Sequence, residues 1–148
     1  SLTTETALQI LNTFYFIQDY LEKYSTLDFL EIDRTKGEAL FYKMGAATSY
    51  IFHSNGTFEK IENEGLPFGI EELIEAKRYK LQNEDVIIMA SDGIFESIFN
   101  EKELETYIKG IIHLSPQKIT YEILNYARNN KNKILDDMSV ITLKIIEN

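Results

Sequence analysis

Two pairs of neighbouring residues place carboxylates where strand patterns end or begin. Asp92 and Gly93 directly follow an apolar run that is typical of a buried strand. Asp136 and Asp137 directly precede a β-branched segment that is typical of another strand. If the two strands pair, these carboxylates meet at one rim of the sheet. Gly93 would let the backbone turn sharply, and it would let the backbone come close to a ligand bound by the carboxylate of Asp92.

Carboxylates placed in this way favour the binding of a hard divalent cation. Two carboxylates about 4 Å apart repel by roughly 4 kcal/mol at an effective dielectric constant of 20, so they need a shared proton or a cation. Oxygen ligands in a chain without cysteine select Mg²⁺ or Mn²⁺. Neighbouring side chains on a strand point to opposite faces, so only one of Asp136 and Asp137 reaches the same point as Asp92. We expect Asp92 and Asp136 to be metal ligands, with Gly93 and Asp137 as secondary candidates.

Each of these pairs also has an ordinary structural interpretation. An isolated Ser-Asp-Gly between a strand and a helix is more often a turn with an Asp cap, and Asp-Asp before a strand is more often a solvated loop. The two histidines favour structural roles, because His53 lies beside a hairpin turn and His113 lies near a helix C-terminus, where a cation is favoured. The acidic residues Glu71, Glu72 and Glu75 are typical of an exposed loop or strand edge. The chemical interpretation therefore depends on Asp92-Gly93 and Asp136-Asp137 coming together.

The first element that the hydrophobic pattern predicts is a helix over residues 2–24, with a break near Gln18 or Asp19. The apolar residues at helical spacing, which we expect to face the core, are Ile10, Phe14, Ile17, Leu21 and Tyr24.

The rest of the chain predicts strands, then helices, then one more strand, which is an α+β order. The expected strands cover residues 26–34, 38–44, 49–53, 57–61, 77–81, 85–91 and 138–146. Lys36-Gly37 and Asn55-Gly56 supply the positive φ of tight hairpins, so the first four strands are expected to form an antiparallel meander. The expected helices are a short stretch at 94–99 and the segments 101–113 and 116–130, the last capped by Ser115 with Pro116 at its first position.

Length and composition limit the classes of protein to consider. The chain has 148 residues, 44% of them hydrophobic, which suits a single domain over 1–148. Its net charge of −9 repels phosphate groups of nucleic acid and anionic lipid, so we expect neither nucleic acid nor a membrane as a direct ligand. The absence of cysteine excludes a disulfide framework, and no apolar run is long enough to span a membrane. We expect a cytoplasmic setting.

Five segments, taken in order, resemble the SpoIIE-type branch of the metal-dependent 2C-type (PPM) protein phosphatases. The matching segments are Thr26-Leu27-Asp28-Phe29, Lys43-Met44-Gly45-Ala46, Leu66-Pro67-Phe68-Gly69-Ile70, Met89-Ala90-Ser91-Asp92-Gly93-Ile94-Phe95-Glu96 and Asp136-Asp137-Met138-Ser139-Val140. The resemblance covers nearly the whole chain. Ser-Asp-Gly-Ile-Phe-Glu followed late by Asp-Asp-Met-Ser-Val is its most specific part.

The resemblance implies an α+β fold in which an antiparallel β-sandwich is flanked by helices. It implies a two-metal centre of Mn²⁺ or Mg²⁺, which activates water to hydrolyse phosphoserine or phosphothreonine. Asp92 and Asp136 match the two late metal-binding aspartates of the family. Asp137 stands where the family has Asn or Asp, and Gly93 would provide the close turn. The implied substrate is a serine-phosphorylated bacterial regulatory protein such as an anti-anti-sigma factor, and family members with transmembrane regions keep this domain in the cytoplasm.

The chain also departs from the family pattern. An earlier family segment carries Gly-Asp and Asp-Gly motifs whose aspartates complete the metal pair, whereas here Gly-Asp is absent and Asp92-Gly93 is the only Asp-Gly. We therefore expect the C-terminal part of a phosphatase domain, lacking its N-terminal strands and inactive alone. An open sheet edge would then favour a homodimer. The alternative is a non-catalytic relative that works as a regulatory or protein-binding module.

Overall fold

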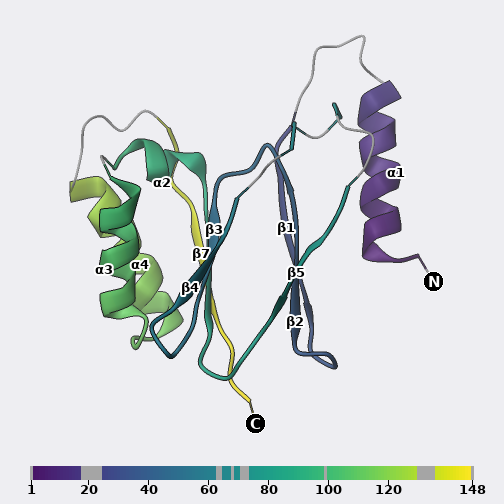
Figure 1. The fold of residues 1–148 in the computed structure, drawn as a ribbon. Helices are drawn as coiled ribbons and strands as arrows, with labels where there is room; N and C mark the ends of the chain where they lie inside the picture. The colour runs from purple at the N-terminus through teal and green to yellow at the C-terminus, as the bar shows by residue number, and fades with distance from the viewer. Residues whose placement is uncertain are drawn as a thin grey trace. The chain divides into compact units, whose positions relative to one another are not determined.

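The computed structural model describes residues 2–17, 25–62, 65–67, 69–70, 74–98, 100–129 and 136–147. The expected break near residues 18 and 19, and the acidic residues 71 and 72, lie outside these ranges. The helices of the described part are α1 (Thr4–Ile17), α2 (Asp92–Glu96), α3 (Glu101–Ile111) and α4 (Pro116–Asn129). The strands are β1 (Leu27–Asp33), β2 (Glu38–Met44), β3 (Ser49–Phe52), β4 (Phe58–Ile61), β5 (Lys77–Lys80), β6 (Val86–Ala90) and β7 (Val140–Lys144) (Figure 1). Each expected strand is confirmed, with bounds that shift by at most two residues.

The chain forms two compact units, one of Ser1–Ala46 with Glu62–Lys80 and one of Ala47–Ile61 with Leu81–Asn148. The first unit holds α1 and a sheet with the strand order β1-β2-β5. The second unit holds α2, α3, α4 and a sheet with the order β4-β3-β6-β7. All described strand pairs are antiparallel. These observations confirm the expected α+β class with antiparallel sheets and helices.

Both expected hairpin turns are present, but the expected four-stranded meander is wrong. Gly37 (φ 61°) closes the β1–β2 turn and Gly56 (φ 87°) closes the β3–β4 turn. However, β2 pairs with β5 rather than with β3, and β3 pairs with β4 and β6. All four residues of β3 are buried, and a buried strand needs hydrogen-bond partners along both of its edges. β2 and β3 belong to different sheets, so no hairpin joins them.

Helix α1 exposes three of the apolar residues that we expected to face the core, and the other two, Leu21 and Tyr24, lie outside the described residues. Ile10, Phe14 and Ile17 are 56%, 57% and 69% exposed, whereas Leu8 and Asn12 are buried. Leu8 packs in a small core with residues of β2, and the Asn12 side chain accepts a hydrogen bond from a loop N–H at 2.8 Å. Because most residues from 10 to 17 are apolar, periodicity alone did not identify the inner face. Leu8 and Asn12 mark the buried face.

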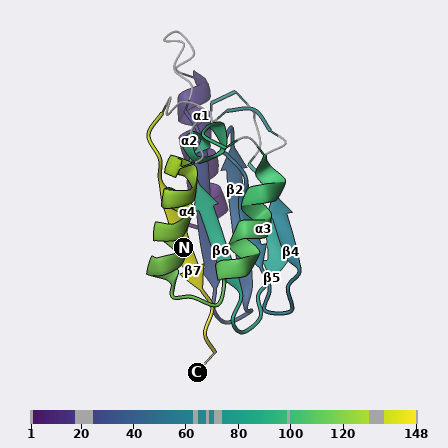
Figure 2. The same ribbon diagram turned by 90° about the vertical axis from the view of Figure 1, so that its left-hand side faces the viewer.

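The core of the second unit lies between its sheet and its helices. Figures 1 and 2 show α3 and α4 side by side over one face of this sheet. Helix α4 buries Ile119, Ile123 and Ala127 against this core. As expected, β6 is buried along most of its length. The described helices include none with the length and apolar character that crossing a membrane requires.

Candidate functional site

The antiparallel pairing of β6 and β7 brings Asp92-Gly93 and Asp136-Asp137 to the same rim of the sheet. The ladder ends with Ala90 opposite Val140. Past this point, the Ser91 N–H donates to the Ser139 carbonyl oxygen at 2.9 Å. The chain then turns into α2 at Asp92. The condition for the two segments to meet, that these strands pair, is therefore fulfilled.

Gly93 lies directly against the backbone of the second aspartate pair. A Cβ atom at this position would clash with the Asp137 carbonyl oxygen, and would lie 3.1 Å from the Asp137 carbonyl carbon and 3.3 Å from the Asp136 carbonyl oxygen. Gly93 belongs to α2 and is buried, so its small size matters here rather than access to positive φ. The absence of a side chain lets the two aspartate-bearing segments touch.

Both predicted metal ligands are exposed to solvent. The Asp92 Oδ1 atom accepts a hydrogen bond from the Gly93 N–H at 3.0 Å. Likewise, the Asp136 Oδ1 atom accepts one from the Asp137 N–H at 2.7 Å. Each carboxylate is thus oriented by the backbone of the next residue while remaining accessible to an ion from solution. The side chain of Asp137 is also exposed.

These oxygen donors fit a hard cation in type but supply only part of its coordination. Mg²⁺ and Mn²⁺ take carboxylate and water oxygens, and Asp92 and Asp136 offer carboxylates. Within the described ranges, however, no three histidine, aspartate or glutamate side chains are grouped so as to hold a metal ion. The remaining ligands of an ion bound here would be water or other protein groups.

Ser91 is a contact residue that the sequence pattern did not single out. Its hydroxyl donates to the Asp137 carbonyl oxygen at 3.2 Å and accepts from the Ser139 N–H at 2.9 Å. The available signal was its position at the end of a buried strand and directly before Asp92. A serine there is so often a helix cap that its sequence position did not indicate a contact across the sheet.

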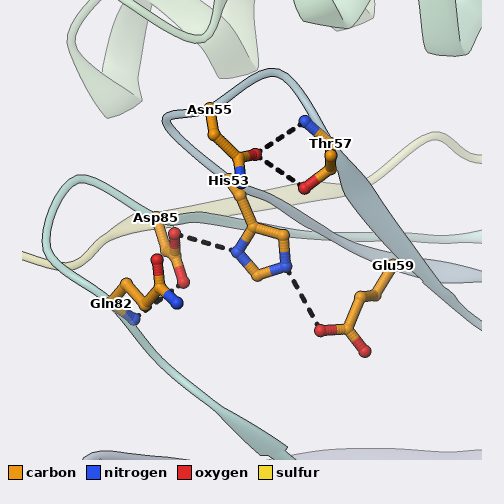
Figure 3. A network of polar contacts seen from close by, with 6 residues as sticks. All are labelled: His53, Asn55, Thr57, Glu59, Gln82 and Asp85. Carbon is orange, nitrogen blue, oxygen red and sulfur yellow. Dashed lines mark hydrogen bonds and ion pairs between the residues drawn. The ribbon is translucent and has the colours of Figure 1, made fainter.

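A second polar cluster lies at the opposite end of β6, where Asp85 precedes the strand (Figure 3). The Asp85 side chain is fully buried, and its Oδ1 atom lies 3.0 Å from Nδ1 of His53. On the other side of the ring, Nε2 of His53 lies 3.2 Å from Oε1 of Glu59. The Gln82 N–H donates to the second Asp85 oxygen at 2.8 Å. The expected structural role of His53 beside a hairpin therefore includes pairing with a buried carboxylate.

The arrangement around His53 favours the charged imidazolium. A neutral imidazole donates from only one nitrogen, whereas the protonated ring has a donor on each side, and each side faces a carboxylate. Burial lowers the pKa of His53, but the interactions with Asp85 and Glu59 outweigh burial and raise that pKa above its usual value. A buried, unpaired Asp85 carboxylate would be costly, so His53 compensates its charge.

The fold belongs to the class of 2C-type (PPM) protein phosphatases. The chain is similar to a solved structure containing the phosphatase domain and a fragment of the regulatory domain of SpoIIE from Bacillus subtilis, with a TM-score of 0.85, 28% identity, and coverage of 98% of this chain and 45% of that one. It is also similar to a solved SpoIIE phosphatase domain from Bacillus subtilis described as Mn presoaked, with a TM-score of 0.75, 26% identity, and coverage of 100% of this chain and 69% of that one.

Sequence comparison agrees with the structural similarity. Residues 1–146 match the family model of stage II sporulation protein E (SpoIIE). The chain is 31% identical over 152 residues to stage II sporulation protein E of Bacillus subtilis (strain 168), covering 96% of this chain. The chain belongs to the SpoIIE family, and it spans 18% of the length of that curated relative.

The first prediction concerns the close contact at Gly93. Gly93→Ala should lower the free energy of unfolding by about 1–3 kcal/mol, because the new methyl group overlaps a backbone carbonyl group rather than a movable side chain. Urea unfolding followed by circular dichroism measures this change. The control is Gly110→Ala in α3, where a Cβ atom meets nothing within 4 Å and the gain in helix propensity should raise stability by about 0.5–1 kcal/mol. Equal effects of the two substitutions would contradict the close contact.

The second prediction concerns pH. Because the pKa of His53 is raised on folding, its contribution to stability is complete below the unfolded-state pKa of about 6.5 and is lost as pH rises through the folded-state pKa. His53→Gln should remove this part of the pH dependence, as measured by urea unfolding across pH 5–9. The control is His113→Gln, which changes the exposed second histidine of the chain and should leave the dependence in place. An imidazole NMR titration giving His53 an ordinary or lowered pKa would refute the interpretation.

Proposed function

We propose that this chain is the metal-binding C-terminal part of a SpoIIE-type protein serine/threonine phosphatase domain. Its proposed substrate is phosphoserine or phosphothreonine on a bacterial regulatory protein such as an anti-anti-sigma factor. The observation that carries the proposal is the meeting of Asp92-Gly93 with Asp136-Asp137 at one rim of a sheet, in a chain of the SpoIIE family.

In this proposal Asp92 and Asp136 hold divalent cations, Mn²⁺ or Mg²⁺. Support for manganese comes from the similar phosphatase domain that is described as Mn presoaked. Bound divalent ions supply neutralisation of phosphoryl oxygens and a hydroxide nucleophile at neutral pH. The protein backbone contributes fixed positions for both carboxylates, through the close approach at Gly93.

The charge of the chain gives a physical reason for the cation. A net charge of −9 repels a phosphorylated substrate, and two carboxylates at the reaction site would repel it further. A divalent ion between carboxylate and phosphate reverses that repulsion locally. The acidic residues would therefore repel a phosphate group in the absence of metal, and would favour its binding once they hold a cation.

We further propose that the remaining ligands of the metal pair come from another part of a longer domain. The described part of this chain lacks a group of three suitable side chains, and the chain covers 69% of the similar Mn-presoaked phosphatase domain. The alternative function is a regulatory or protein-binding module of the same fold. The incomplete donor set in the described residues favours that alternative, so metal binding and turnover must be measured separately.

The third prediction is that this chain binds Mn²⁺ weakly at the two aspartates. Titration with Mn²⁺ should broaden the amide NMR signals of Gly93 and Asp137 before other signals. Asp92→Asn and Asp136→Asn should each raise the dissociation constant by at least about tenfold, since a lost ligand should cost no less than a lost outer-shell partner.

Two further variants serve as controls for the metal site. Glu96→Gln neutralises an exposed carboxylate at the end of α2 and should leave the dissociation constant unchanged. Asp137→Asn should resemble this control, because Asp136 is the proposed ligand. If Asp137→Asn weakens binding and Asp136→Asn does not, the choice between the two is wrong. If no aspartate variant differs from Glu96→Gln, the metal site is wrong.

The fourth prediction concerns turnover. This chain alone should hydrolyse p-nitrophenyl phosphate or a phosphoserine peptide little or not at all with Mn²⁺, because the described residues offer only part of the metal coordination. A longer protein that contains the proposed remaining part of the domain should hydrolyse both, and Asp92→Asn or Asp136→Asn should abolish that activity. Robust turnover by this chain alone would contradict the incomplete site. A longer protein that binds Mn²⁺ without turnover would favour the regulatory module.

A further inference from the structure

Ser91 occupies the N-cap position of α2 but does not cap the helix. An N-cap serine normally accepts a hydrogen bond from the second or third N–H of its own helix, and Ser91 makes no such bond. Its hydroxyl instead contacts the segment that carries the second aspartate pair, as donor to Asp137 and acceptor from Ser139. The side chain is therefore used between segments rather than within α2.

This contact takes over where the β6–β7 ladder ends. The last backbone bond runs from the Ser91 N–H to the Ser139 carbonyl oxygen. One residue later the chain enters α2 at Asp92, so its backbone no longer follows the neighbouring strand. A hydroxyl is donor and acceptor at once, and Ser91 thereby satisfies the Ser139 N–H and the Asp137 carbonyl oxygen at the point where backbone pairing stops.

We propose that Ser91 is a positioning residue, whose hydroxyl holds the Asp136-Asp137 backbone in place beside Asp92. Gly93 permits the two segments to touch, but the absence of a side chain does not fix their relative position. The two hydrogen bonds of Ser91, which lies between β6 and Gly93, fix that position. The consequence for metal binding rests on the proposed function, whereas the positioning itself is a property of the metal-free chain.

The metal-free test is amide hydrogen exchange measured by NMR. Ser91→Ala should speed exchange of the Ser139 amide by roughly two- to tenfold, the equivalent of one hydrogen bond of ordinary strength. Ser91→Thr keeps the hydroxyl and should restore protection. Ser139→Ala is the matched control, because it removes an exposed hydroxyl from the other side of the contact and retains the backbone N–H. Unchanged Ser139 exchange in Ser91→Ala would overturn the proposal.

The amides of Leu104 and Ile108, buried in α3, report whether each variant keeps its fold. If Ser91→Ala does not fold, Ser91→Cys replaces it, because a thiol has a similar shape but forms only weak hydrogen bonds. Faster exchange at Ser139 alone then supports the proposal. Equal acceleration at Ser139, Leu104 and Ile108 would show a loss of global stability and would overturn the proposal of a local contact.

The metal-dependent test is a Mn²⁺ titration of the same variants. Ser91→Ala should raise the dissociation constant by roughly 10- to 100-fold, as for other residues that orient a ligand without touching the ion, while Ser91→Thr and Ser139→Ala should bind like the unsubstituted chain. An unchanged dissociation constant in Ser91→Ala would refute positioning of the metal site. If the unsubstituted chain itself shows no Mn²⁺-dependent broadening at residues 92–93 and 136–137, the proposed function fails, and the exchange experiment still decides whether Ser91 positions this backbone.

Discussion

The contact between Gly93 and the backbone of Asp136 and Asp137 is the constraint on which the candidate site depends. Antiparallel pairing of β6 and β7 brings the two segments to one rim, but pairing ends before either aspartate. Close approach past that end requires a residue without a Cβ atom, and Ser91 ties the approaching segments together. A site built in this way places its carboxylates through backbone geometry, so both side chains remain exposed and available to an ion.

The carboxylates that flank β6 differ in burial. Asp85, before the strand, is fully buried, and His53 compensates its charge. Asp92, after the strand, is exposed, with the Gly93 N–H as its hydrogen-bond donor. A buried carboxylate needs a fixed partner of the protein's own, whereas an exposed one tolerates exchange between water and a cation. The difference in burial thus separates a structural ion pair from a candidate ligand, although both residues flank the same strand.

Local patterns predicted the elements well and their partners less well. The strands and hairpin turns were recognised because alternation, apolar runs and Asn-Gly or Lys-Gly turns depend on neighbours in sequence. The meander was wrong because pairing of β2 with β5 and of β3 with β6 is decided by residues far apart in the chain. The inner face of α1 was wrong for a related reason: Leu8 packs with residues of β2 and Asn12 accepts a hydrogen bond from a loop N–H, and the apolar period of the helix encodes neither of these long-range contacts.

The amino-acid sequence by itself determined the α+β order, the acidic character and the positions of Asp92-Gly93 and Asp136-Asp137 at strand ends, because each is set by residue type and local spacing. It also pointed to the SpoIIE-type phosphatases through motifs in a particular order. Only the tertiary structure decided that these two segments meet, that Gly93 serves by its size, and that Ser91 and His53 make the contacts described. Such contacts depend on distances between residues widely separated in the chain, which exist only once β3, β6 and β7 have paired.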